Sequence, residues 1–130
     1  MSLFKRRRNK GEYMGGCIVS RNILNGKGKI KWCFREESVR PIDNGWRILS
    51  DIDTDEFINE PSNNAVCGFQ SMLLIEPALI LIYDLPVGSD LVLIKSEGQI
   101  GFYDINTGEK VVGMTESDAG IRRFPRERKL

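Results

Sequence analysis

The spacing of hydrophobic and polar residues predicts several short strands along the chain. Residues 16–20 (GCIVS) form an apolar run suited to a buried strand, and the partial alternation in residues 29–35 (KIKWCFR) is typical of a half-buried strand. The dipeptide Asn25-Gly26 between them favours a turn. Further strands are predicted at residues 45–50, 65–69, 79–83 and 91–95.

Helical signals are fewer and shorter. Residues 51–60 are predicted as a short helix, because Asp53 or Thr54 can cap it, acids in its first turn suit the helix dipole, and Pro61 follows its end. A brief helical turn is predicted over residues 71–75.

The order of these elements predicts the fold class. The continuous aliphatic run 79–83 (LILIY) is the candidate for the central strand, and residues 99–104 and 109–112 are expected to pair as a hairpin. Strands outnumber helices and do not alternate with long helices, which argues against parallel βαβ winding. We therefore predict an α+β fold, a single domain with a mostly antiparallel sheet and two short helices.

Charge is unevenly spread, although nineteen Lys and Arg residues nearly balance eighteen Asp and Glu residues. The first ten residues contain five bases and no acid, residues 122–130 contain five bases and one acid, and residues 11–121 contain nine bases and seventeen acids. We expect one domain over residues 13–114, between a basic flexible N-terminal tail at residues 1–12 and a basic C-terminal tail at residues 115–130.

The basic ends allow two interpretations. Terminal charge runs are usually solvated, but these ends, together with Lys27, Lys29 and Lys31, also suit an accessory protein that contacts nucleic-acid phosphates. The formal net charge of +1 argues against a dedicated nucleic-acid binder.

Composition removes several classes of chemistry. The chain has no histidine, which excludes histidine triads and histidine-ligated metals. The three cysteines, Cys17, Cys33 and Cys67, form no Cys-x-x-Cys pair, and each is expected to pack as a small hydrophobic residue. We expect no metal, no cofactor and no catalytic residue, and a distant alternative is an enzyme that uses a pair of carboxylates.

Two motifs are incomplete. The acids at 51, 53 and 55 resemble the opening of a calcium loop, but Glu56 and Ser62 replace its required glycine and closing glutamate. The segment 26–29 (GKGK) lacks the Ser or Thr and the following helix of a phosphate-binding loop.

The apolar stretch 72–83 is broken by Glu76 and Pro77 and falls short of the roughly 20 residues that span a bilayer. The basic start of the chain leads into GEYMGG rather than the apolar centre of a secretory signal. We therefore expect a cytoplasmic protein that makes no membrane contact.

An acidic body without a catalytic constellation suits a protein that binds a basic partner. Trp32 and Trp46 are the largest apolar residues, and each is either a core residue or an interface anchor. The expected partner-contact surface consists of Arg35, Glu36, Asp43, Trp46, Asp53 and Asp55.

Four segments of the chain resemble the bacterial immunity-protein-33 family, which was long catalogued as a domain of unknown function. They are residues 17–20 (CIVS), 32–36 (WCFRE), 43–50 (DNGWRILS) and 59–63 (NEPSN).

The resemblance covers residues 14–95, and the run D-N-G-W-R-x-x-S is its most specific part. It implies an α+β immunity protein of a polymorphic toxin system, which binds the catalytic domain of a toxin and blocks it stoichiometrically. The expected partner is thus a cognate toxin, and the alternative is a nucleic-acid-associated accessory protein that uses the basic tails. A homodimer stays open.

Overall fold

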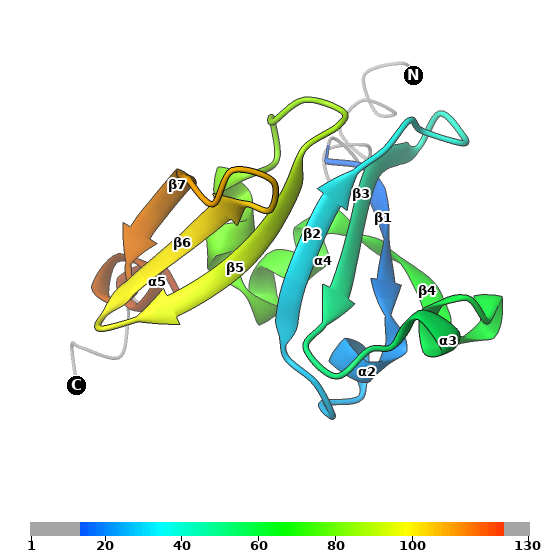
Figure 1. The fold of residues 1–130 in the computed structure, drawn as a ribbon, viewed down its shortest axis with the longest axis horizontal. Coiled ribbons are helices and arrows are strands. Elements are labelled where there is room, and N and C mark those ends of the chain that lie inside the picture. The colour runs from blue at the N-terminus through cyan, green and yellow to red at the C-terminus, as the bar shows by residue number, and fades with distance from the viewer. Residues whose placement is uncertain (1–13, 124–130) are drawn as a thin grey trace, which may run out of the picture.

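The computed structural model describes residues 14–123, which form a single α+β domain around one seven-stranded sheet (Figure 1). The strands are β1 (Gly16–Ser20), β2 (Ile30–Arg35), β3 (Asp43–Ser50), β4 (Asn64–Gly68), β5 (Asp90–Ser96), β6 (Gln99–Asp104) and β7 (Lys110–Thr115). Their order across the sheet is β4-β1-β3-β2-β5-β6-β7. Only β1 and β3 pair in parallel, so the predicted mostly antiparallel sheet is confirmed.

The described part of the chain contains more short helices than the two predicted. The α-helices are α2 (Arg21–Leu24), α3 (Asp55–Ile58), α4 (Phe69–Ile75) and α5 (Glu116–Arg123), and the 3-10 helices are η2 (Pro61–Asn63) and η3 (Pro77–Leu81). Figure 1 shows α4 behind the sheet. The core there is fully buried and includes Trp46, Ile48, Phe69, Leu79 and Phe102. We call the side of the sheet that bears this core the covered face, and the opposite side the open face.

The predicted central strand at residues 79–83 is wrong. This segment belongs largely to η3, and the central position in the sheet is held by β2. Pro77 begins η3, where its missing N–H costs no hydrogen bond, and the Glu76 carboxylate accepts one from the backbone N of Ala78 at 3.1 Å. Leu79 is fully buried in the core. An unbroken apolar run of this kind is compatible with a buried helix as well as with a buried strand.

The predicted helix over residues 51–60 is confirmed only at α3. Thr54, one of the two predicted caps, accepts a hydrogen bond from the backbone N of Phe57 at 3.1 Å. The carboxylate of Asp53, the other predicted cap, instead bonds to residues outside the helix.

The predicted hairpin is confirmed as β6 and β7, and Gly108 in its turn has a φ of +76°, which glycine adopts without strain. Although the sequence predicts a tail from residue 115, β7 runs through Thr115 and α5 follows it, with Ala119 buried. The predicted N-terminal tail at residues 1–12, and residues 124–130 of the C-terminal tail, lie outside the described residues.

Candidate functional site

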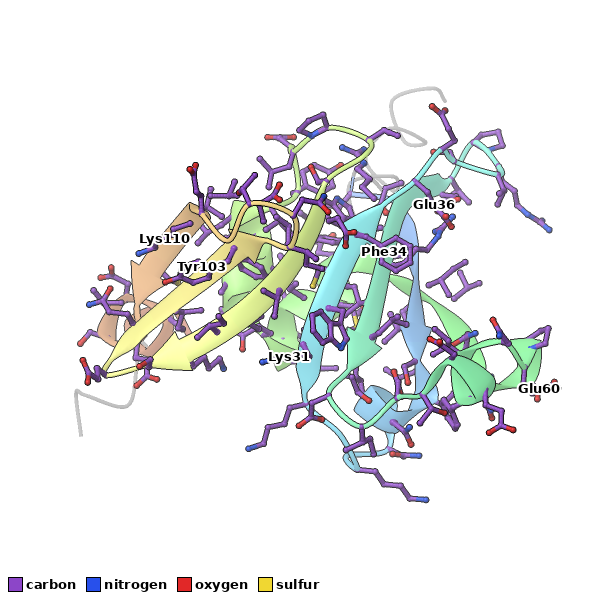
Figure 2. The ribbon with its side chains drawn as sticks, in the orientation of Figure 1. Lys31, Phe34, Glu36, Glu60, Tyr103 and Lys110 are labelled. Carbon is purple, nitrogen blue, oxygen red and sulfur yellow. The ribbon has the colours of Figure 1, made fainter. Side chains whose placement is uncertain are left out.

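The open face of the sheet carries two rows of side chains that cross neighbouring strands. The register of the strands makes the members of each row cross-strand neighbours, so their side chains project from the same face. Figure 2 shows Phe34, Tyr103 and Lys110 on this side of the ribbon. The rows are Arg47–Phe34–Asp90 and Leu49–Trp32–Val92–Tyr103–Lys110.

A groove of about 360 Å³ is hollowed into this face, and we call it the Trp32 groove. Aromatic and aliphatic side chains from β2 and β3 contribute to its lining, together with α3 and the segment that leads into it, the start of β5, and the turn after β6. Among the described residues of the lining, three side chains are carboxylates and none is a lysine or arginine. The lining residues are Trp32, Phe34, Leu49, Asp53, Thr54, Asp55, Ile58, Asp90 and Ile105.

The two tryptophans lie on opposite faces of the sheet. Trp46 is 0% exposed, and its indole N donates to the backbone O of Tyr83 at 3.3 Å. Trp32 is 37% exposed and lines the groove. Of the two, therefore, Trp32 has a surface that a partner can contact, and Trp46 is a core residue.

Two acids on the predicted surface form a buried ion pair network with Arg47, which is only 4% exposed. The Arg47 guanidinium donates from Nη1 and Nη2 to the two carboxylate oxygens of Asp43, at 2.9 and 3.0 Å, and from Nε to Glu36 Oε2 at 2.7 Å. Hydrogen bonding to Arg47 holds the pKa of Asp43 far below its usual range, and the same bonds raise the pKa of Arg47. Asp43 therefore stabilises the fold, whereas the Glu36 side chain keeps 56% of its surface exposed.

Arg35 is also held by the fold. Its Nε donates to the backbone O of Asn44 at 2.8 Å, and its Nη1 donates to the backbone O of Leu85 at 2.7 Å. Its guanidinium carbon lies 5.9 Å from the centroid of the Trp46 ring. These contacts tie the loop before β5 to the edge of β2 and β3.

Asp53 fastens the segment before α3 to the first strand. Its carboxylate accepts hydrogen bonds from Ser20 Oγ at 2.9 Å, Asn22 Nδ2 at 2.8 Å and the backbone N of Ser50 at 2.7 Å. Burial alone would raise the pKa of Asp53, but these hydrogen bonds outweigh it and lower the pKa.

The structure therefore divides the six predicted contact residues. Glu36 and Asp55 are exposed, while Arg35, Asp43, Trp46 and Asp53 are engaged inside the fold. The sequence gives no signal for Asp90, a further groove residue, because it stands just before the predicted strand 91–95, and only the pairing of β5 with β2 places it beside Phe34.

The run D-N-G-W-R forms the first part of β3, directly after the turn at residues 41–42. Asn44 Oδ1 accepts a hydrogen bond from the backbone N of Trp46 at 2.9 Å, and its Nδ2 donates to the backbone O of Met14 at 2.7 Å. Gly45 has a φ of +89°, and a Cβ there would lie 2.2 Å from the backbone O of Glu36. This run therefore needs its residue types for the fold, whatever the protein binds.

A second cavity of about 510 Å³ lies beside the turn after α2 and the end of α4. Its polar lining is mixed in charge, with Lys29, Lys31 and Lys95 beside Asp51 and Glu76. Lys95 Nζ lies 2.5 Å from Glu76 Oε1, so part of this charge is already neutralised within the cavity.

The three cysteines are free thiols, and Cys17 and Cys33 are buried. Burial raises the pKa of Cys17 to about 12 and also raises the pKa of Cys33 and Cys67. Within residues 14–123, no group of three His, Cys, Asp or Glu side chains is arranged to hold a metal ion. No helix in the same part of the chain has the length and hydropathy needed to cross a membrane.

The fold and the groove define a small α+β protein with one open, partly apolar sheet face. Residues 17–104 match the model of the immunity protein Imm33 domain, so the chain belongs to this family, as the resemblance of its motifs implied. The match spans β1 to β6 and includes every residue of the Trp32 groove except Ile105. Comparisons with curated proteins and with solved structures gave no match.

Proposed function

We propose that this protein is a non-enzymatic immunity protein that binds a cognate toxin domain through the open face of its sheet and neutralises it in the cytoplasm. Membership of the immunity protein family supports the general role. The observation that supports this particular face is the Trp32 groove, which combines an exposed tryptophan with carboxylates within the family-matched region.

The energetics of interfaces favour this face. Tryptophan is among the residues that dominate the binding energy of an interface when a partner covers them. Trp32 is 37% exposed and lies on β2, which is paired on both sides, with β3 and with β5. Val66 on β4, 78% exposed, is the cross-strand neighbour of Ile18 and extends apolar surface to the edge of the sheet. Such surface gains free energy when a partner removes it from water.

Carboxylates at the edges of the face suit a basic partner. Asp55 is exposed at the start of α3, and Glu36, just after β2, stays exposed although one of its two carboxylate oxygens accepts from Arg47, so acids flank the aromatic residues on two sides. Charge of one sign at the rim of an interface speeds the encounter with a partner of opposite sign and disfavours partners of like charge.

The first test asks whether the gene immediately upstream encodes a protein with a carboxy-terminal toxin domain. The second is complex formation with that domain, by titration calorimetry on the full chain, together with growth rescue in cells that express the domain. We expect a one-to-one complex and rescue by the wild type. Trp32→Ala should weaken binding at least about tenfold, because a central tryptophan is typically worth 2 kcal/mol or more.

The matched control is Leu74→Ala, which removes a side chain that is 78% exposed but belongs to α4, behind the sheet. It should bind and rescue like the wild type. Equal loss in both variants, or none in Trp32→Ala, would contradict the proposed face. Absence of any complex with the wild type would contradict the proposed function.

A further inference from the structure

We propose that the Trp32 groove is a receptor for one arginine side chain of the bound toxin, with the guanidinium over the Trp32 ring and between the carboxylates of Asp55 and Asp90. This inference rests on the proposed function for the identity of the partner. The groove itself is argued from its own lining and charge.

The lining of the groove has an unbalanced charge. Within residues 14–123, it contains three carboxylates and no lysine or arginine. Asp53 is saturated, since Ser20, Asn22 and the backbone of Ser50 donate to it. The side chains of Asp55 and Asp90, by contrast, have no ion pair or hydrogen bond with any other part of residues 14–123.

The two unpaired carboxylates belong to different elements of the groove. Asp55 is the first residue of α3, and Asp90 is the first residue of β5, where the register places it next to Phe34. Both line the same 360 Å³ space as Trp32, so a cation that enters it meets carboxylates from separate parts of the chain. That arrangement suits a ligand with several donors, rather than a single ion pair on the surface.

The Trp32 ring already has a cation near it. Lys31 Nζ lies 5.8 Å from the centroid of the ring, within the range at which an ammonium is attracted to the negative face of an indole. The ring of Trp32 is thus able to attract a cation, and a guanidinium in the groove must share this ring with Lys31 or displace its ammonium, since Lys31 is not one of the described residues that line the groove.

The chemistry of the site selects arginine over lysine. A guanidinium is planar, stacks on an aromatic ring, and presents five N–H donors that can reach two carboxylates at once. An ammonium is more strongly hydrated and loses more on entering an apolar groove. With a volume near the lower end of the roughly 300–1,000 Å³ typical of ligand pockets, the groove fits one side chain.

The first test uses a probe that does not depend on the toxin. The full chain is titrated with the peptide acetyl-Gly-Arg-Gly-amide and, as the matched control ligand, with acetyl-Gly-citrulline-Gly-amide, which keeps the shape and loses the charge. The two indole N–H signals in an NMR spectrum report the site. The Trp32 signal should shift with the arginine peptide and not with the citrulline peptide, and the signal of buried Trp46 should stay fixed in both.

The second test uses variants that remove one charge. Asp90→Asn and Asp55→Asn should each weaken binding of the arginine peptide and of the toxin domain by about fivefold, the scale of one partly solvated cation contact. Glu97→Gln is the matched control, because Glu97 lies in the turn after β5, seven residues from Asp90 and roughly 20 Å away along an extended strand. It should bind both ligands like the wild type.

Equal shifts with the two peptides, an unmoved Trp32 signal, or equal loss in Glu97→Gln would overturn the arginine receptor. If the toxin complex still depends on Trp32 under any of these results, the proposed function survives without the receptor. If the peptide binds as expected but the toxin domain does not, the receptor survives and the proposed function fails.

Discussion

The covered face and the open face of the sheet are built from the same strands and have different roles. On β2, Cys33 is fully buried on the covered face, while its neighbour Trp32 is 37% exposed on the open face. On β3, Trp46 points into the core and Arg47 lies in the row with Phe34. Because successive side chains of a strand point to opposite faces, one strand supplies both residues of the core and residues of the face that we propose as the binding surface.

The carboxylates show the same division. Asp43 binds buried Arg47 with both oxygens and contributes to the fold, whereas Asp55 and Asp90 border the groove and have no ion pair with any residue in the described part of the chain. An acid whose two carboxylate oxygens are both paired has little to offer a partner, because a new bond must replace an existing one. The comparison teaches that exposure and pairing, rather than residue type alone, distinguish the carboxylates that are free to contact a partner from those that the fold already uses.

The largest expected effect separates the two tryptophans. Trp46→Ala should lower the free energy of unfolding by about 3–5 kcal/mol, since it empties a fully packed site, while Trp32→Ala should lower it by about 1 kcal/mol or less. Urea denaturation followed by circular dichroism measures both. Equal destabilisation by the two substitutions would break the division between the faces.

The next effect concerns the buried ion pair. Asp43→Asn should lower the free energy of unfolding by about 3 kcal/mol at pH 7, because it leaves the Arg47 charge buried and poorly compensated. Since the folded pKa of Asp43 lies below its ordinary value of 3.8, the wild type should keep this stabilisation above that value and lose it as the pH falls from there toward the folded pKa.

The variant should lack this part of the acid dependence, which unfolding experiments between pH 2 and pH 7 will show. Asp55→Asn, at an exposed position without an ion pair in the described part of the chain, is the control and should follow the wild-type profile. An Asp43→Asn profile as steep as the wild type's would contradict the role of the pair.

The smallest effect concerns the reactivity of the three cysteine thiols, which tests the packing of the covered face without changing the fold. At pH 8 a thiol reagent should react first with Cys67, which is only partly buried, and with Cys17 and Cys33 only after urea unfolds the chain, because burial raises their pKa and blocks access. Mass spectrometry of the modified chain assigns each site, and Cys67→Ser should remove the early reaction. Three equal rates in the folded protein would contradict the packing of this face.

Local patterns predicted much of the fold. The apolar run at β1, the alternation in β2 and the hairpin of β6 and β7 each contain their own signal, since strand period and turn residues act over a few positions. The prediction of a strand at residues 79–83 is wrong because an unbroken apolar segment has no hydrophobic period. Such a segment can be buried either as a strand or as a helix.

The candidate site was predicted only in part. The sequence predicts Asp55 and Glu36 as contact residues, and both are exposed. It favours Trp46 over Trp32 as the tryptophan of the surface, and it gives no signal for Asp90. The alternation of residues along β2 indicates that Trp32 and Cys33 lie on opposite faces of the sheet. It does not indicate which of the two faces is covered by a helix, and this covering determines which tryptophan is exposed to solvent.

By itself the sequence determined the α+β class, the absence of histidine chemistry and the family, because composition, period and short motifs belong to the chain before it folds. Only the tertiary structure decided which acids were already paired with Arg47 and which lined the Trp32 groove. The physical reason is that burial and pairing are set by contacts between strands far apart in the sequence, such as β2 with β5, and no local pattern contains those contacts.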